Sequence, residues 1–191
     1  MDKTSGFFIL VFCVVQAVSG YAPVVFCPRY VDEGSDVDCD CHAPLPGMEG
    51  AIITWLGISN TSRLRIPAVS RRDNGTKYLC ELKWKNLSYT VVYTLQVAYG
   101  PADAAMYIDG PSYFVTDGSK PLTLTCLVYE VNPEPIVTWL SQPCNDGREQ
   151  KTCTFIPDVL MHDCTTITCR ALNSVTQRIA VGTASFTLHL K

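Results

Sequence analysis

The sequence predicts an all-β protein made of two tandem β-sandwich domains behind a signal peptide. Three observations support this prediction. Short segments alternate apolar and polar residues, the turns between them are rich in Gly, Pro, Asn and Asp, and the chain of 191 residues has 10 cysteines. No long segment has the 3.6-residue apolar period of an amphipathic helix. Because so many cysteines in a short chain are typical of disulfide-stapled domains, we expect an oxidising compartment.

The N-terminus has the pattern of a secretory signal peptide. Lys3 precedes an apolar run at residues 7–15, and small residues follow up to Ser19 and Gly20. We expect residues 1–20 to be removed, which takes Cys13 away and leaves nine of the cysteines. The alternative is a membrane anchor, which is less favoured because the run has about half of the roughly 20 apolar residues that a span requires. No second stretch is long enough, so we expect no membrane span in this chain.

The composition argues against two classes of protein. Apolar residues make up 47% of the chain, which is enough for a core and is not typical of a disordered protein. Charged residues make up only 17%, and the net charge is −3. A nucleic-acid-binding protein needs a strongly basic surface, so we expect no nucleic-acid partner.

A triplet of Cys126, Trp139 and Cys169 organises the second half of the chain. Residues 122–126 alternate as in a strand, a Pro-rich turn follows, and residues 136–139 form another strand-like segment. This order and spacing match the immunoglobulin sandwich, in which a disulfide joins two sheets across a layer about 10 Å thick and the tryptophan packs on it. We therefore expect a Cys126–Cys169 bond with Trp139 as a core residue.

The first half repeats this triplet with Cys41, Trp55 and Cys80. We expect a strand over residues 34–41, and Tyr78 stands two residues before the cysteine, in the position of the tyrosine corner of this fold. In the second half Ile167 takes that position.

An internal repeat supports two copies of one unit. The pattern Ile-Pro-X-Val-X-X-X-Asp occurs at residues 66–73 and again at 156–163. We place domain 1 at residues 21–98, a short linker at 99–102 and domain 2 at 103–191.

With both triplets in place, the chain resembles the immunoglobulin superfamily, with domains similar to the I or C2 sets. The Tyr-Gly-Pro linker and the segment at 118–126 are similar to adjacent domains in carcinoembryonic-antigen-type and nectin-type adhesion molecules. The interval from Trp55 to Cys80 is too short for the extra strands of a variable-type domain. The resemblance implies adhesion or immune recognition but does not identify a ligand.

The remaining cysteines suggest further bonds. In domain 1 we assign Cys41–Cys80 as the inter-sheet bond. Cys39 faces the same side of its strand as Cys41, so Cys27 on the preceding strand is its natural partner. The swapped pair Cys39–Cys80 stays open, because sequence does not fix connectivity. A thiolate metal site built from these four cysteines is the other alternative, and an oxidising compartment argues against it.

In domain 2, Cys144 and Cys153 flank a polar loop and are expected to close it. Cys164 is then left over, and an odd cysteine in a secreted protein suggests either an intermolecular bond or a free thiol. We interpret it as a link between two copies of the chain, with a buried, inert thiol as the alternative. A Cys164→Ser variant that still migrated as a reducible dimer would contradict this interpretation.

Three Asn-X-Ser/Thr triplets agree with secretion, and all lie in the first half. The acceptor residues are Asn60, Asn74 and Asn86.

The sequence has no recognisable catalytic constellation. None of the histidines, which are His42, His162 and His189, lies in a nucleophile elbow, a zinc-binding helix or a phosphate loop. We therefore expect no enzymatic activity, no cofactor and no metal.

Two surfaces are candidates for binding. The first is the loop between Cys144 and Cys153, since a bond across a loop lowers the entropy lost when a ligand binds. Its candidate contact residues are Asn145, Asp146, Gly147 and Arg148. The second candidate surface is an arginine cluster in domain 1, which suits an anionic glycan or acidic partner, although such a row is more often an ordinary solvated strand face. Its members are Arg63, Arg65, Arg71 and Arg72.

Together these patterns predict a secreted, extracellular recognition protein of adhesion or immune defence. Its expected partner is a protein or glycan on cells or pathogens, or a second copy of the chain. The alternative is the truncated ectodomain of a single-pass membrane receptor, held at the cell surface by a partner or in a longer isoform.

Overall fold

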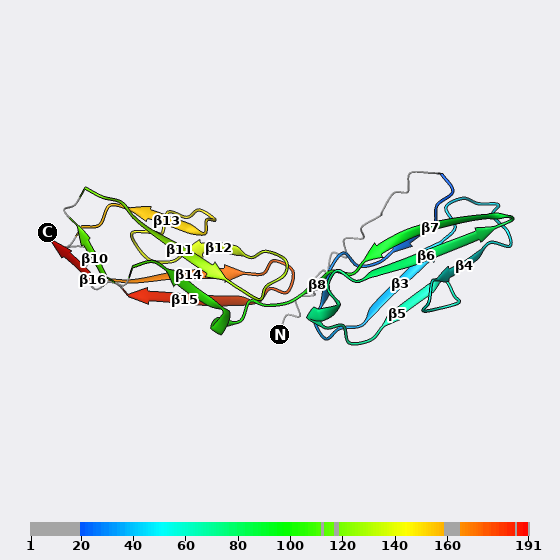
Figure 1. Ribbon diagram of the computed structural model, residues 1–191, viewed down its shortest axis with the longest axis horizontal. Coiled ribbons are helices and arrows are strands. Elements are labelled where there is room, and N and C mark those ends of the chain that lie inside the picture. The colour runs from blue at the N-terminus through cyan, green and yellow to red at the C-terminus, as the bar shows by residue number, and fades with distance from the viewer. Residues whose placement is uncertain (1–19, 112, 117–118, 159–164, 186, 191) are drawn as a thin grey trace, which may run out of the picture. The chain divides into compact units, whose positions relative to one another are not determined.

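The computed structural model describes residues 20–111, 113–116, 119–158, 165–185 and 187–190. The chain divides into two compact units, Met1–Val97 and Ala98–Lys191, and each is built from β-sheets (Figure 1). The predicted all-β class is confirmed. The described part of the chain holds no helix with the length and apolarity needed to span a bilayer. The predicted signal peptide falls on residues 1–19, which lie outside the described residues, and on Gly20.

Unit 1 has two three-stranded antiparallel sheets, with strand orders β1-β3-β5 and β4-β6-β7, and a short pairing of β2 with β8. Its strands are β1 (Val24–Phe26), β2 (Val31–Asp32), β3 (Val37–His42), β4 (Ile52–Trp55), β5 (Arg63–Ile66), β6 (Lys77–Trp84), β7 (Leu87–Thr94) and β8 (Val97–Ala98). A 3₁₀ turn, η1 (Arg71–Asp73), precedes β6.

The core of unit 1 lies between these two sheets. Cys41 on β3 bonds to Cys80 on β6, with their Cα atoms 6.6 Å apart, and the bond joins the sheets. Trp55 on β4 is buried, and its indole N–H donates to the carbonyl oxygen of Ser62 at 2.9 Å. Cys27, which directly follows β1, bonds to Cys39 on β3.

One strand of unit 1 is shorter than the sequence suggests. The expected strand at residues 34–41 begins only at Val37. Gly34 has a φ of +89°, and the amide of Ser35 donates to the carbonyl oxygen of Asp32 at 3.0 Å. This turn uses the backbone groups that a strand would have offered to its neighbours.

Unit 2 repeats the scheme with sheets of order β9-β11-β13 and β12-β14-β15, and adds a parallel pair, β10-β16. Its elements are η2 (Asp103–Ala105), β9 (Met106–Asp109), β10 (Tyr113–Thr116), β11 (Leu122–Val128), β12 (Ile136–Trp139), β13 (Thr152–Phe155), β14 (Thr166–Leu172), β15 (Ile179–Ser185) and β16 (Thr187–Leu190).

The core of unit 2 is centred on the bond between Cys126 on β11 and Cys169 on β14. Trp139 on β12 is opposite Cys169 in the register and is buried. The alternation expected from sequence is present on β11, where Leu122 and Leu124 face inward with Cys126.

Asn173 anchors the start of unit 2. It is fully buried, and its side-chain amide donates to the carbonyl oxygens of Tyr99, Gly100 and Asn132 at 3.0, 3.2 and 3.0 Å. Its side-chain oxygen Oδ1 accepts from the amide of Val175 at 3.0 Å. Residues 99–102 therefore lie within unit 2, and the domain limits drawn from the sequence stay a prediction.

Candidate functional site

The loop at residues 144–153 is anchored at both ends in the core of unit 2. Cys144 and Cys153 form a disulfide with Cα atoms 5.4 Å apart, and both are buried in the core cluster. Cys153 lies on β13, while Cys144 follows β12 after a short turn. The loop thus connects the two sheets of the sandwich.

Asp146 organises the tip of this loop. Its carboxylate accepts from the amide of Arg148 and from the side-chain amide of Gln150, both at 3.0 Å. Asn145 donates to the carbonyl oxygen of Leu140 at 3.3 Å. These bonds hold the loop in one shape while its residues 145–149 stay exposed to solvent.

The C-terminal part of the loop, at Gln150 and Lys151, is hydrogen-bonded to both sheets. The amide of Gln150 donates to the carbonyl oxygen of Val137 on β12 at 3.0 Å, and the carbonyl of Lys151 accepts from the amide of Cys126 on β11 at 2.8 Å. Lys151 also pairs with Glu134, and this ammonium lowers the pKa of the Glu134 carboxyl. The loop therefore presents ordered amide, carboxylate and guanidinium groups, which suit hydrogen bonding to a partner.

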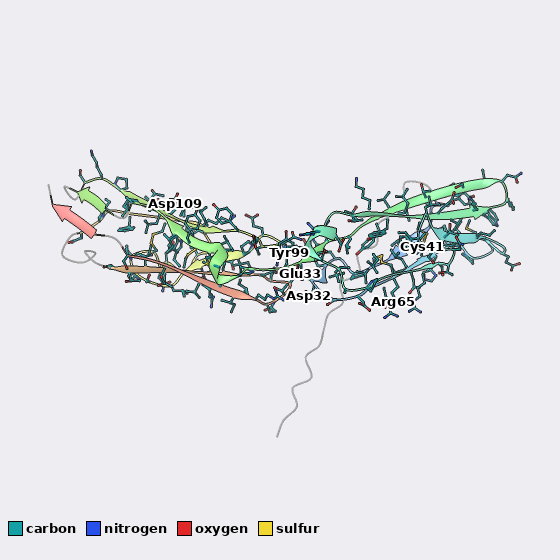
Figure 2. The ribbon with its side chains drawn as sticks, turned by 60° about the horizontal axis from the view of Figure 1, so that its bottom comes forward. Asp32, Glu33, Cys41, Arg65, Tyr99 and Asp109 are labelled. Carbon is teal, nitrogen blue, oxygen red and sulfur yellow. A yellow bond between two sulfur atoms is a disulfide. The ribbon has the colours of Figure 1, made fainter. Side chains whose placement is uncertain are left out.

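Three of the four arginines in the cluster of unit 1 lie beside carboxylates, and Arg72 is exposed without a carboxylate partner among the described residues. Arg65 on β5 points away from its sheet and donates to Asp36 at 3.0 Å (Figure 2). Arg63 lies 3.9 Å from the carboxylate of Asp40, which is opposite it in the register. A ligand anion at this surface would have to compete with these internal carboxylates.

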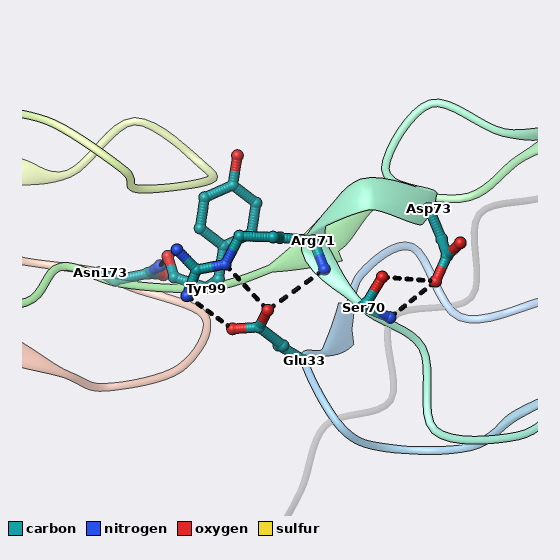
Figure 3. A network of polar contacts seen from close by, with 6 residues as sticks. All are labelled: Glu33, Ser70, Arg71, Asp73, Tyr99 and Asn173. Atoms are coloured by element: carbon teal, nitrogen blue, oxygen red, sulfur yellow. Dashed lines mark hydrogen bonds and ion pairs between the residues drawn. The ribbon is translucent and has the colours of Figure 1, made fainter.

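At η1, another arginine of the cluster is paired with a carboxylate. The guanidinium of Arg71 donates to the carboxylate of Glu33 at 2.9 and 3.0 Å (Figure 3). Nearby, the carboxylate of Asp73 accepts from the amide and the hydroxyl of Ser70 at 2.7 and 3.0 Å. These hydrogen bonds lower the pKa of the Asp73 carboxyl. The charged groups here serve to hold the turn in place.

The predicted glycan acceptors all lie in exposed positions. Asn60 follows β4, and Asn86 lies in the two-residue turn between β6 and β7. The side-chain oxygen of Asn74 accepts from the amide of Val97 at 2.9 Å. A glycan is attached through the amide nitrogen, so this bond leaves the acceptor atom of Asn74 chemically available. Glycosylation stays a prediction at all three residues.

Several predicted features lie outside the described residues. Cys164 and His162 are among them, so the intermolecular disulfide stays a prediction. The eight cysteines that the structure describes form the four bonds given above. In the described part of the chain, no group of three or more His, Cys, Asp or Glu side chains is placed to hold a metal ion.

The outer face of the β12-β14-β15 sheet carries polar residues that were not predicted as a site from the sequence. Arg170 on β14 and Thr138 on β12 lie opposite each other on this face. The Nε of Arg170 and the Oγ1 of Thr138 are buried and have no hydrogen-bond partner among the described residues. Strand alternation from the buried residues Cys169 and Trp139 would have identified both as outward-facing.

Comparison with known proteins supports the fold assignment. No family model matches the chain. Nephrin from Mus musculus is 33% identical over 111 residues, which are 54% of this chain and 8% of nephrin. The four N-terminal Ig domains of Dscam1 isoforms 1.9 and 4.44 align with TM-scores of 0.56 and 0.54, at 19% and 21% identity. Each alignment covers 84% of this chain, and 43% and 42% of the Dscam1 chains.

These likenesses, together with the two disulfide-joined sandwiches, show that the chain has the immunoglobulin fold in tandem. It spans less than a tenth of nephrin and less than half of each Dscam1 chain. The closer resemblance to carcinoembryonic-antigen-type and nectin-type molecules stays a prediction.

Proposed function

We propose that this chain is an extracellular recognition protein that binds another protein through the disulfide-closed loop of unit 2 and catalyses no reaction. The observation that carries this proposal is the exposed tip at residues 145–148, held by the Cys144–Cys153 bond and by the carboxylate of Asp146. A loop that is already ordered loses little conformational entropy when a partner binds.

A protein ligand is favoured over an anionic glycan. Arg63 and Arg65, the two residues considered for a glycan, already face carboxylates of their own sheet. The loop in unit 2 exposes Asp146 and Arg148, a pair of opposite charges 3.9 Å apart, together with amide groups. Charges of both signs allow electrostatic complementarity with a protein surface, whereas an anionic glycan would be repelled by Asp146. The similarity to nephrin and the immunoglobulin fold support a role in adhesion or immune recognition outside the cell.

A second candidate function is that of the binding region of a longer single-pass receptor. The similarity to nephrin, of which the matched segment is 8%, supports this alternative. Transcripts that continue in frame into an apolar stretch of about 20 residues would favour it. Transcripts that end at Lys191 in every tissue would argue for a secreted factor.

The proposal is tested with the full chain, purified from secretory cells and multimerised, against an array of purified receptor ectodomains. In the test variant, Gly and Ser replace residues 145–148 while Cys144 and Cys153 remain. We expect saturable binding to a protein ectodomain that the loop variant weakens about tenfold or more. The control is the double variant Arg63→Ala and Arg65→Ala, which should bind as the parent does.

Two results would contradict the proposal. A loop variant that keeps the affinity of the parent would remove the loop from the contact. A multimer that binds no ectodomain but binds isolated glycans would replace protein recognition with glycan recognition.

A further inference from the structure

A row of four residues crosses the outer face of unit 2. Glu149 forms an isolated antiparallel bridge with Thr138, Thr138 is opposite Arg170, and Arg170 is opposite Val181. Residues directly opposite each other in antiparallel strands point to the same face. The neighbouring row, which includes the buried Cys169, points into the core, so this row faces outward.

The polar side chains of this row lack side-chain partners among the described residues. The Oγ1 of Thr138 and the Nε of Arg170 are buried and have no hydrogen-bond partner among the described residues. Neither Arg170 nor Glu149 forms an ion pair or side-chain hydrogen bond with any side chain that the structure describes. Buried polar atoms without a partner are unfavourable, and their presence needs an explanation.

An apolar row lies beside the polar one. Ile136, Leu172 and Ile179 are opposite one another on the three strands. Ile179 is 53% exposed, and Val181 in the polar row is 46% exposed. The face therefore combines apolar side chains, which a contact can bury, with two charges that have no partner among the described residues and that a complementary partner could pair.

We propose that this face binds the same face of a second copy of the chain in a twofold-symmetric dimer. Glu149 and Arg170 carry opposite charges and lie one strand to either side of Thr138, about 5 Å away in each direction. A twofold axis that passes over Thr138, between the two copies and parallel to the strands, therefore places each Glu149 against the partner copy's Arg170. The same patch serves both copies, as in other isologous interfaces.

A second copy fits this face better than an unrelated partner because the charges of the row complement themselves. A partner with a uniformly acidic surface would meet Arg170 but would also be repelled by Glu149. All three glycan acceptors precede residue 98, so no predicted glycan is attached to unit 2. This inference goes beyond the proposed function, since its partner is the chain itself and its residues lie outside the segment 145–148.

The test uses the full chain with Cys164→Ser, which removes any covalent dimer, in sedimentation equilibrium. We expect reversible dimers, and the variants Arg170→Glu and Glu149→Arg should each raise the dimer dissociation constant about tenfold or more because like charges then meet. An equimolar mixture of the two variants should form heterodimers, since an acidic row then meets a basic one. The double variant Arg170→Glu with Glu149→Arg should recover self-association.

The control is Lys120→Glu, an equal change of charge at an exposed residue of unit 2 outside the row, which should leave self-association unchanged. Thermal unfolding of each variant checks that it is folded. A parent that stays monomeric at about 1 mM would overturn the inference. So would folded single variants that associate as the parent does, or a mixture that forms no heterodimer.

The two proposals fail separately. Dimers that respond to the charge changes, together with no binding to any ectodomain, would keep this inference and remove the proposed function. Ectodomain binding by a chain that stays monomeric would do the reverse.

Discussion

Each unit has a charged residue at the same position of the fold, but the side-chain partners of these two residues differ. Glu81 in unit 1 and Arg170 in unit 2 each follow the cysteine that joins the sheets, and each lies on the outer face. The carboxylate of Glu81 accepts from the hydroxyl of Ser88 at 2.7 Å and pairs with Lys83 at 3.0 Å. Arg170 has no such partner among the described residues, and its Nε is buried.

We interpret the paired charges of unit 1 as groups that stabilise the fold, and the unpaired charge of Arg170 as a group available to a partner. In unit 1 the arginines 63, 65 and 71 are also matched by carboxylates. In unit 2 the exposed loop and the outer face carry groups that a partner can use. We therefore propose that recognition takes place through unit 2.

The largest expected difference between the units is the stability lost when a glycine with positive φ is replaced by alanine. Gly100 has a φ of +62°, and a Cβ there would lie 2.2 Å from the backbone oxygen of Glu130. We expect Gly100→Ala to destabilise unit 2 by about 3 kcal/mol or more, because backbone must move. Gly75 in unit 1 has a φ of +84° with open space around it, so Gly75→Ala should cost only about 1–2 kcal/mol.

Denaturant unfolding of both glycine variants measures this difference. Equal losses of unfolding free energy would contradict the expected clash between a Cβ at residue 100 and the backbone oxygen of Glu130.

The second disulfide of each unit should contribute similarly to stability but differently to binding. The bond Cys27–Cys39 spans 12 residues and Cys144–Cys153 spans 9. The loss of loop-closure entropy in the unfolded chain predicts about 2.5–3 kcal/mol for each. Replacing either pair by alanines should lower the unfolding free energy by that amount, while only loss of the Cys144–Cys153 bond should weaken ectodomain binding.

Binding isotherms of the two double-alanine variants, taken where both are still folded, check this prediction. Equal weakening of binding would contradict the assignment of recognition to unit 2.

Alkaline pH should destabilise unit 1 more than unit 2, where the exposed Tyr107 also has a raised pKa because of its hydrogen bond with Tyr129. Tyr93 is buried opposite Tyr78 in unit 1, and burial raises the pKa of Tyr93 from 10.0 to about 12. Since the folded state holds this proton more tightly, its stabilisation is complete below pH 10 and is lost as the pH rises towards 12. The expected loss is roughly 2–3 kcal/mol. The equivalent pair in unit 2 is Ile167 and Ala184, which do not titrate.

Unfolding followed between pH 9 and about 12 by a probe in each unit measures this effect. The control is Tyr93→Phe, which should flatten the pH dependence of unit 1. A parallel loss of stability in unit 2 would contradict the prediction.

The smallest effect is expected from the exposed arginines of unit 1. Arg65→Gln removes a solvent-exposed ion pair with Asp36, and such pairs contribute little. We expect no measurable change in melting temperature and none in ectodomain binding. A clear loss of binding would indicate that the arginine cluster contacts the ligand.

The sandwich cores could be predicted from the sequence because they depend on spacing and alternation. The triplets around Trp55 and Trp139 identify the central strands, and the alternation of residues 122–126 matches the burial on β11. The start of β3 was misplaced because Gly34 forms a turn with φ of +89°, and sequence alone does not show where pairing begins.

The charge row of unit 2 could not be predicted in the same way. Arg170 and Thr138 follow from strand alternation, but Glu149 joins them only through an isolated bridge made by a loop residue. The pairing of Arg63 with Asp40 likewise depends on the register of β5 against β3, which the intervening loop sets. Long-range register of this kind is determined by packing and not by local sequence.

The most direct measurement compares the carboxylates of the two outer faces. Carbodiimide labelling of the full chain with Cys164→Ser, read by mass spectrometry over a range of protein concentrations, reports the accessibility of Glu149 and of Glu81. We predict that labelling of Glu149 falls as the dimer forms, while that of Glu81, which is satisfied within unit 1, stays constant. Labelling of Glu149 that is independent of concentration, in a sample shown to contain dimers, would contradict the assignment of the dimer contact to the outer face of unit 2.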